Sequence, residues 1–193
     1  MTATAHALIG ASLAVKIANP ILGIPIAILS HFIADLVPHC DAGTNHKKKS
    51  MNRLRFEAVL DVLLGFALVF LIFRNLVDPI YLFVMVIAAQ SPDWLEAPSW
   101  MFNIKVPPFS WLDWLGHKLQ TRMQLPWGLV TQIVSVGIMI IIALGGLNNL
   151  TTVLASNFWI NLTFLSKVLT LILTLLFQHI PRFSYQPESF LHF

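Results

Sequence analysis

Long apolar runs separated by short polar segments make up most of this chain. The first run covers residues 5 to 18, with Thr4 as the expected cap, and stops at Asn19-Pro20, a pair that typically ends a helix. The second covers residues 20 to 37, with Pro20 in its first turn, and the third covers about 54 to 73. Because a membrane-crossing helix needs about 20 apolar residues, these runs predict membrane helices, the shorter first one being tilted or re-entrant.

The remainder of the chain continues the pattern less evenly. A fourth helix is predicted over residues 79 to 90, followed by a Pro- and Trp-rich connection over residues 91 to 125. Within this connection an amphipathic helix is expected from Phe109 to about Met123. The predicted fold is therefore an all-α membrane bundle of about five to six membrane helices plus one interfacial helix. It is completed by two more apolar segments, roughly 126 to 145 and 158 to 177.

The composition supports the membrane class. Hydrophobic residues occupy 56% of the 193 positions and charged residues only 11%, with a mean hydropathy of +0.74. Soluble domains carry about 25% charged residues, so this chain has too few charges to cover a globule exposed to water. Its length suits a single integral-membrane domain over residues 1–193, with the polar site in residues 1–125 and the last helices completing the bundle. We expect the lipid bilayer as its partner and no nucleic acid.

The distribution of basic residues predicts the orientation. With six crossings, most of the Lys and Arg residues fall on the side that holds the polar loop over residues 39 to 55. The positive-inside rule makes that side cytoplasmic, which predicts a multi-pass protein of the inner (plasma) membrane. The candidate site residues cluster on the same side, so the site is expected to face the cytoplasm.

The densest group of candidate ligands follows the second apolar run. His31 and Asp35 are one helical turn apart and therefore share a face. Pro38 ends or bends the helix, so His39 and Asp41 are delivered from a turn close to that face. Imidazole nitrogens and carboxylate oxygens that converge from a helix end and the following loop predict a metal site.

Other candidates lie far away in the sequence. Asp35 and Asp61 are expected at or below headgroup depth, where ionisable residues usually have partners and functions. Asp93 follows the fourth run in Pro92-Asp93, as either a site residue or part of an ordinary helix-ending turn. His6 becomes a third imidazole ligand if the first two helices pack as a hairpin. Asp113 and His117 are one turn apart on the amphipathic helix, as either an additional ligand pair or its solvated face.

This arrangement of residues resembles the integral-membrane metal-dependent hydrolases, small inner-membrane proteins of bacteria and archaea. The resemblance is carried by His6, His31-x3-Asp35-x2-Pro38-His39-x-Asp41, Asp61 and Pro92-Asp93. It covers mainly the first half of the chain, with a looser match over residues 114 to 128 around His117. The resemblance implies a helical bundle with a bound divalent metal and a hydrolytic role on a phosphoester or lipid. Family members often have a further His and Asp pair in the loop where this chain has Thr44-Asn45-His46.

The hypothesis is therefore hydrolysis by metal-activated water at the cytoplasmic leaflet. The donor types favour Zn²⁺, with Mn²⁺ or Fe²⁺ as alternatives, and such a metal lowers the pKa of a bound water from 15.7 toward about 7. Asp61 or Asp93 is the predicted acceptor of the water's proton. The predicted metal ligands are His6, His31, Asp35, His39 and Asp41. The predicted phosphate-binding residues are Lys48, Lys49 and Arg53.

Two other classes of function stay open at this point. A proton- or metal-coupled transporter would use the same His and Asp residues as a relay across the bilayer. It is disfavoured because residues 64 to 73, the second half of the third run, include no ionisable side chain. In a non-catalytic membrane scaffold, the polar cluster would only lock the helices together.

Overall fold

A computed structural model of the chain describes residues 1–41, 44, 48–146 and 148–157, together with 162, 163, 166, 167 and 170. The chain divides into two units, Met1–Asn157 and Phe158–Phe193. Most of the predicted last apolar segment, residues 158 to 177, lies outside the described residues. The following description therefore concerns the first unit.

The described part of the first unit is helical, as the sequence predicts. Residues 148–157 are helical, and a parallel bridge joins His39 to Arg122. The helices with defined ends are α1 (Ala3–Lys16), α2 (Pro20–Asp35), α3 (Met51–Phe73), α4 (Pro79–Phe102), α5 (Phe109–Leu119) and α6 (Trp127–Leu144).

Several predicted helix ends are confirmed, and one cap differs. Helix α2 begins at Pro20 behind the Asn19 cap, and α6 ends at Gly145 in the left-handed conformation, with φ of 79°. Helix α1 is capped by Thr2, whose hydroxyl accepts a hydrogen bond from the Ala5 amide at 3.2 Å. The sequence suggests Thr4 for this role, but the Thr4 hydroxyl instead donates to Asp61 of α3 at 2.6 Å.

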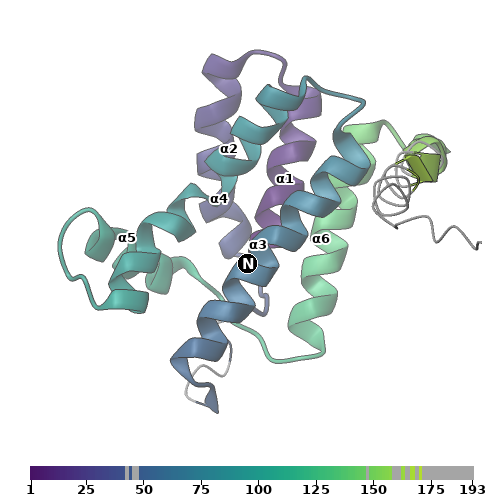
Figure 1. The fold of residues 1–193 in the computed structure, drawn as a ribbon. Coiled ribbons are helices and arrows are strands. Elements are labelled where there is room, and N and C mark those ends of the chain that lie inside the picture. Colours follow the sequence, from purple (N-terminus) through teal and green to yellow (C-terminus); the bar gives the residue numbers. More distant parts are fainter. Residues whose placement is uncertain are drawn as a thin grey trace, which may run out of the picture. The chain divides into compact units, whose positions relative to one another are not determined.

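Helix α1 forms the centre of the unit. Figure 1 shows it running between α4 and α6, with α3 crossing it, and its residues from Ala5 to Ser12 are all buried. Small residues let its neighbours approach closely. A Cβ atom on Gly10 would lie 2.7 Å from Ala89 Cβ and 2.8 Å from the Met85 carbonyl oxygen of α4. This close approach packs the middle of α1 against the first half of α4.

Helix α4 is longer than the sequence predicts. The first part of the expected connection over residues 91 to 125 is therefore helical, and the prediction was wrong there. The helix continues past Gln90 to Phe102, although Pro92 lies within it. Pro92 has no N–H to donate to the Ala88 carbonyl, but the Ser91 hydroxyl donates to that oxygen at 2.8 Å. The lost helical bond is thus replaced by a side-chain bond. Asp93 consequently projects from a helix and not from a turn.

Two of the described helices, α3 and α6, are long and apolar enough to cross a membrane. Only 17% of the apolar window of α3 and 28% of that of α6 are buried, whereas the core helix of a soluble protein is mostly buried. The number is smaller than the predicted five to six. Helix α2 is apolar but has 16 residues, α1 has 14, and the second half of α4 is polar.

Candidate metal centre

The end of α2 supplies the first part of a buried polar cluster. His31 and Asp35 lie one turn apart, both buried, with His31 Nε2 3.5 Å from Asp35 Oδ2. Beyond the helix the chain turns, and His39 returns to the same carboxylate, with its Nε2 3.8 Å from Asp35 Oδ1. The prediction that the turn at Pro38 brings His39 close to the His31–Asp35 face agrees with these positions.

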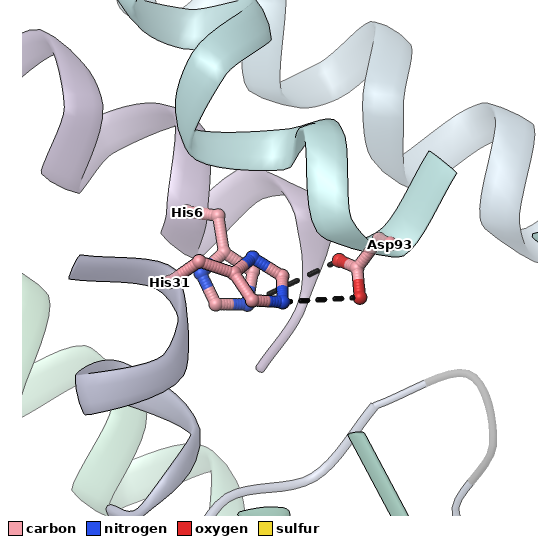
Figure 2. Close-up of side chains that lie close together, drawn as sticks. All are labelled: His6, His31 and Asp93. Atoms are coloured by element: carbon pink, nitrogen blue, oxygen red, sulfur yellow. Dashed lines mark ion pairs between the residues drawn. The ribbon is translucent and has the colours of Figure 1, made fainter. Parts of the chain in front are cut away.

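Helix α1 adds a third imidazole. The His6 ring stacks on that of His31, with ring centroids 3.9 Å apart and an interplanar angle of 20° (Figure 2). His6 Nε2 lies 3.3 Å from Asp35 Oδ1. The amino group of Met1 also contacts this oxygen. The expected pairing of His6 with the residues of α2 is therefore present in the structure.

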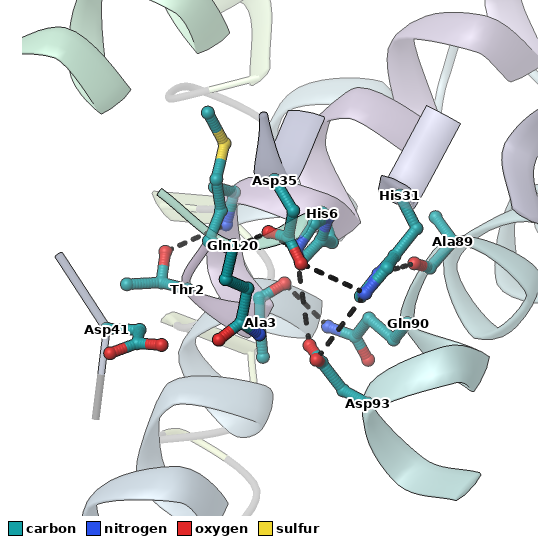
Figure 3. Close-up of polar contacts among 12 residues, drawn as sticks. Thr2, Ala3, His6, His31, Asp35, Asp41, Ala89, Gln90, Asp93 and Gln120 are labelled. Carbon is teal, nitrogen blue, oxygen red and sulfur yellow. Dashed lines mark hydrogen bonds and ion pairs between the residues drawn. The ribbon is translucent and has the colours of Figure 1, made fainter. Parts of the chain in front are cut away.

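Helix α4 brings a second carboxylate to the same Nε2 atoms of the two rings. Asp93 Oδ1 lies 3.5 Å from His31 Nε2, and Asp93 Oδ2 lies 4.0 Å from His6 Nε2. Figure 3 shows Asp35 and Asp93 both pointing toward the stacked imidazoles. His6, His31 and Asp93 offer one ligand atom each, all within 4.8 Å of one another, and this group could hold a metal ion.

The outer nitrogens of two rings bind backbone carbonyls. His31 Nδ1 is 2.9 Å from the Ala89 oxygen, and His39 Nδ1 is 2.7 Å from the Val37 oxygen. Since a carbonyl only accepts, each Nδ1 carries the proton and each Nε2 presents a lone pair to the cluster. Burial also lowers the pKa of the His39 imidazole, which favours its neutral form. This arrangement is the one that metal-binding histidines adopt.

Two of the nitrogens that face the cluster lack a partner. His6 Nε2 and His39 Nε2 are buried and accept no hydrogen bond from any described residue. Buried polar atoms are rarely left unsatisfied, and a bound ion can satisfy such a pair of nitrogens. On a tetrahedral Zn²⁺ ion with bonds of about 2.0–2.1 Å, ligand atoms lie roughly 3.3–3.5 Å apart. Within the group of His6, His31 and Asp93 the nitrogen-to-oxygen distances are 3.5 and 4.0 Å, and Asp35 lies 3.3 and 3.5 Å from the same two imidazoles. These separations are close to those around such a cation, so the group could hold one.

A pocket of about 570 Å³ borders the cluster between α3, α4 and α5. Asp93 lines it and is the cluster carboxylate that reaches solvent, since its side chain is 24% exposed and that of Asp35 only 2%. The pocket is within the size range of small-molecule sites, about 300–1,000 Å³. A reactant in this pocket would therefore meet the cluster at Asp93.

Asp41 lies outside the cluster. It lines the pocket, accepts a hydrogen bond from the Thr44 hydroxyl at 2.9 Å and pairs with Arg122 Nε at 3.2 Å. Its predicted ligand role therefore has no support from the positions of the described ligand atoms, whereas Asp93, predicted as a catalytic carboxylate, lies directly against both imidazoles.

Asp61 is engaged with the first turn of α1. Its carboxylate accepts hydrogen bonds from the Ala3 amide at 2.6 Å, the Thr4 amide at 3.2 Å and the Thr4 hydroxyl at 2.6 Å. A carboxylate at a helix N-terminus compensates the unpaired amides and the helix dipole. Asp61 also lines the pocket, but its three bonds give it a positioning role toward the helix that carries His6.

The remaining predicted residues form two groups at a distance from the imidazoles. Asp113 binds Ser99 at 2.7 Å and Lys105 at 3.2 Å. Burial opposes ionisation of Asp113, but these bonds hold the pKa of its carboxyl below the usual value. His117 Nδ1 binds the Asp113 carbonyl oxygen at 2.8 Å, and its ring lines the outer part of the pocket.

The predicted phosphate-binding residues lie at the start of α3 or just before it. Lys49 Nζ and Arg53 Nε both pair with Glu57, at 2.7 and 2.8 Å. Lys48, Lys49 and Arg53 are not among the described residues that line the pocket. Their predicted contact with a substrate is not tested by these positions.

Sequence reasoning missed two amides that hold the first turn of α1. Gln90 of α4 donates to the Ala3 carbonyl at 2.8 Å, and Gln132 of α6 exchanges two hydrogen bonds with Thr2, at 3.1 and 3.0 Å. Both glutamines are buried. Each is an isolated amide in an apolar helix, and this is the signal that identifies interhelical hydrogen bonds in membrane proteins.

No protein-family model matches this chain, and comparisons with curated proteins and with solved structures also give no match.

Proposed function

We propose that this protein is a membrane-embedded metal-dependent hydrolase whose divalent cation is held by His6, His31 and Asp93. The observation that carries the proposal is the convergence of buried imidazole nitrogens with lone pairs on two carboxylates, at the separations that a shared ion requires. Zn²⁺ suits this donor set best, with Mn²⁺ or Fe²⁺ as alternatives. Asp35 supplies the balancing negative charge between the three imidazoles.

The proposed membrane arrangement extends the two candidate spans to the five to six crossings that the sequence predicts. Apolar residues exposed along α2 support its inclusion, among them Ile21, Leu29 and Ile33. Such a face is stable in contact with lipid and unfavourable in water. The site then lies toward the cytoplasm, on the side of the basic loop.

The chemistry follows from the positions of the side chains. A bound divalent cation supplies a Lewis acid and makes water acidic enough to provide hydroxide near neutral pH. Asp93 faces the pocket, and its carboxylate oxygen that does not bind the cation is placed to take up the proton of the attacking water. Asp35 and the Ala89 carbonyl fix the His31 ring, which Asp93 contacts. The walls of the pocket would hold an ester substrate at that end.

The two other classes of function explain less. A scaffold that uses polar residues only to lock helices together would satisfy its buried groups, yet two imidazole nitrogens accept no hydrogen bond from the described chain. A transporter needs ionisable groups on both sides of the bilayer centre. The described carboxylates near the imidazoles, Asp35, Asp61 and Asp93, gather at one end of α1.

Elemental analysis of the full chain in neutral detergent tests the proposal. We expect the wild type to retain about one divalent cation per chain, and His31→Ala to retain less than a tenth of that amount, because the ring that both carboxylates contact is lost. His117→Ala is the matched control, since its exposed imidazole lies outside the cluster, and it is expected to retain the wild-type amount. A wild-type protein that binds no Zn²⁺, Mn²⁺ or Fe²⁺ after incubation with each would overturn the proposal.

A further inference from the structure

The pocket beside the cluster has one long apolar wall. Helix α3 contributes Leu54, Ala58 and Val62, and α4 contributes Trp100 and Met101. On α4, Trp100 and Met101 follow Asp93 by about two helical turns, so this part of the apolar wall lies away from the carboxylate. A wall of this kind gains binding free energy by burying a hydrocarbon chain, and it contributes little to the binding of a small polar ligand.

The other part of the pocket contains a guanidinium group held in a fixed place. Arg122 is the one arginine or lysine among the described lining residues. Its Nε donates to Asp41 at 3.2 Å and its Nη2 donates to Gln120 at 2.7 Å. An arginine has five N–H donors in a planar fork, so donors remain for a ligand in the pocket.

The backbone holds Arg122 in register with the cluster. The Thr121 amide donates to the Asp35 carbonyl at 3.1 Å, the His39 amide donates to the Thr121 carbonyl at 3.0 Å, and the Met123 amide donates to the His39 carbonyl at 2.7 Å. The residues on both sides of Arg122 are thus bonded to the segment that carries Asp35 and His39. The backbone hydrogen bonds that position Asp35 and His39 therefore also position the Arg122 guanidinium.

Most of the carboxylates that line the pocket already have partners within the protein. Asp41 pairs with Arg122, Asp61 binds the start of α1, and Asp93 lies against the imidazoles. Glu96 also faces the pocket and would attract a cation. With a divalent cation at Asp93, the polar part of the pocket presents two positive centres, the ion and Arg122.

We propose that this pocket binds an amphiphile with an anionic, phosphate-type headgroup, which Arg122 holds beside the cluster while the hydrocarbon chain lies along α3 and α4. This inference rests on the proposed function, because it places the headgroup next to the cation site. Arginine suits a phosphate group because its fork forms two parallel charge-assisted hydrogen bonds. Arg122 takes the role that the sequence analysis gave to Lys48, Lys49 and Arg53.

Calorimetric titration of the zinc-loaded full chain in neutral maltoside detergent tests the inference, with dodecyl phosphate, inorganic phosphate and dodecyltrimethylammonium as probes. Dodecyl phosphate is expected to bind at least tenfold more tightly than either other probe. Arg122→Gln should weaken its binding about tenfold or more, since a hydrogen bond to a charged group is lost. Arg74→Gln, which changes an arginine at the C-terminal end of α3 that is not among the described residues lining the pocket, should leave the affinity unchanged.

A second variant separates the chain-binding wall from the arginine. Ala58→Trp fills the apolar part of the pocket, so it should weaken dodecyl phosphate about tenfold and leave inorganic phosphate unaffected. Equal affinity for inorganic phosphate and dodecyl phosphate would overturn the proposal that the ligand is an amphiphile and would indicate a free phosphate instead. Tighter binding of dodecyltrimethylammonium, or no effect of Arg122→Gln, would overturn the anionic headgroup.

Metal analysis on the same samples keeps the two proposals distinguishable. If wild type and Arg122→Gln retain equal amounts of zinc but bind dodecyl phosphate equally well, the inference fails and the proposed function stands. If the wild type retains no zinc, the proposed function fails. In that case, loss of dodecyl phosphate binding in Arg122→Gln would still support the role of the arginine.

Discussion

Replacement of Gly10 by leucine is expected to prevent stable packing of the helical unit. Even the Cβ atom would lie 2.7 Å from Ala89 Cβ and 2.8 Å from the Met85 carbonyl oxygen, and these backbone-linked atoms cannot move aside without shifting α4. Overpacking of this kind costs about 3 kcal/mol or more, which exceeds the gain of about 1 kcal/mol from replacing glycine within a helix. Thermal unfolding in detergent, followed by circular dichroism, measures the change.

Gly137→Ala provides the matched control. Gly137 lies within α6, and a Cβ atom there would meet no described atom within 4 Å. The substitution should therefore be neutral or stabilising by up to about 1 kcal/mol. Metal content gives a second measurement, because displacement of α1 from α4 separates His6 from Asp93. A Gly10→Leu protein with wild-type melting temperature and metal content would show that α1 and α4 do not pack as described.

Asp61→Ala is expected to lower the free energy of unfolding by about 2–4 kcal/mol, from the combined loss of a helix cap and of charge-assisted hydrogen bonds. The first turn of α1 would lose the acceptor for the Ala3 and Thr4 amides and for the Thr4 hydroxyl. Chemical unfolding in detergent measures this difference. Metal affinity should fall with it, because the same turn carries His6.

Glu57→Ala is the control for Asp61, since Glu57 lies one turn earlier on the same helix. It pairs with Lys49 and Arg53 at the surface, and such pairs contribute less than about 1 kcal/mol. If Asp61 acts only as a catalytic base, Asp61→Ala will retain wild-type stability and metal content and lose only hydrolysis. That result would contradict the positioning role.

The sequence was informative about the local part of the candidate site. The turn-by-turn spacing of His31 and Asp35 and the helix-ending effect of Pro38 are local properties of the backbone, and they led correctly to the cluster at the end of α2. The positions of His6 and Asp93 depend instead on how closely α1 and α4 approach, which Gly10 and its neighbours determine. Such long-range packing is not encoded in a single helical pattern.

The continuation of α4 past Gln90 shows a different limit of prediction from sequence. A Pro-Asp pair after a polar serine is typical of a helix end, and the prediction stopped the helix there. The Ser91 hydroxyl replaces the missing bond at Ala88, so the helix continues. Arg122 was missed for a different reason, which is the pairing of two distant segments. Its position comes from a bridge to His39, which joins segments more than eighty residues apart and leaves no periodic signal.

The position of α1 at the centre of the unit has a consequence for biosynthesis. Its first turn is completed by Asp61, Gln90 and Gln132, so α1 obtains its final hydrogen-bond partner only when α6 has been synthesised. Until then, the Thr2 amide has only water as a partner, since the Gln132 side chain accepts from it in the folded unit. Chains interrupted before residue 132 therefore keep an unfinished helix end.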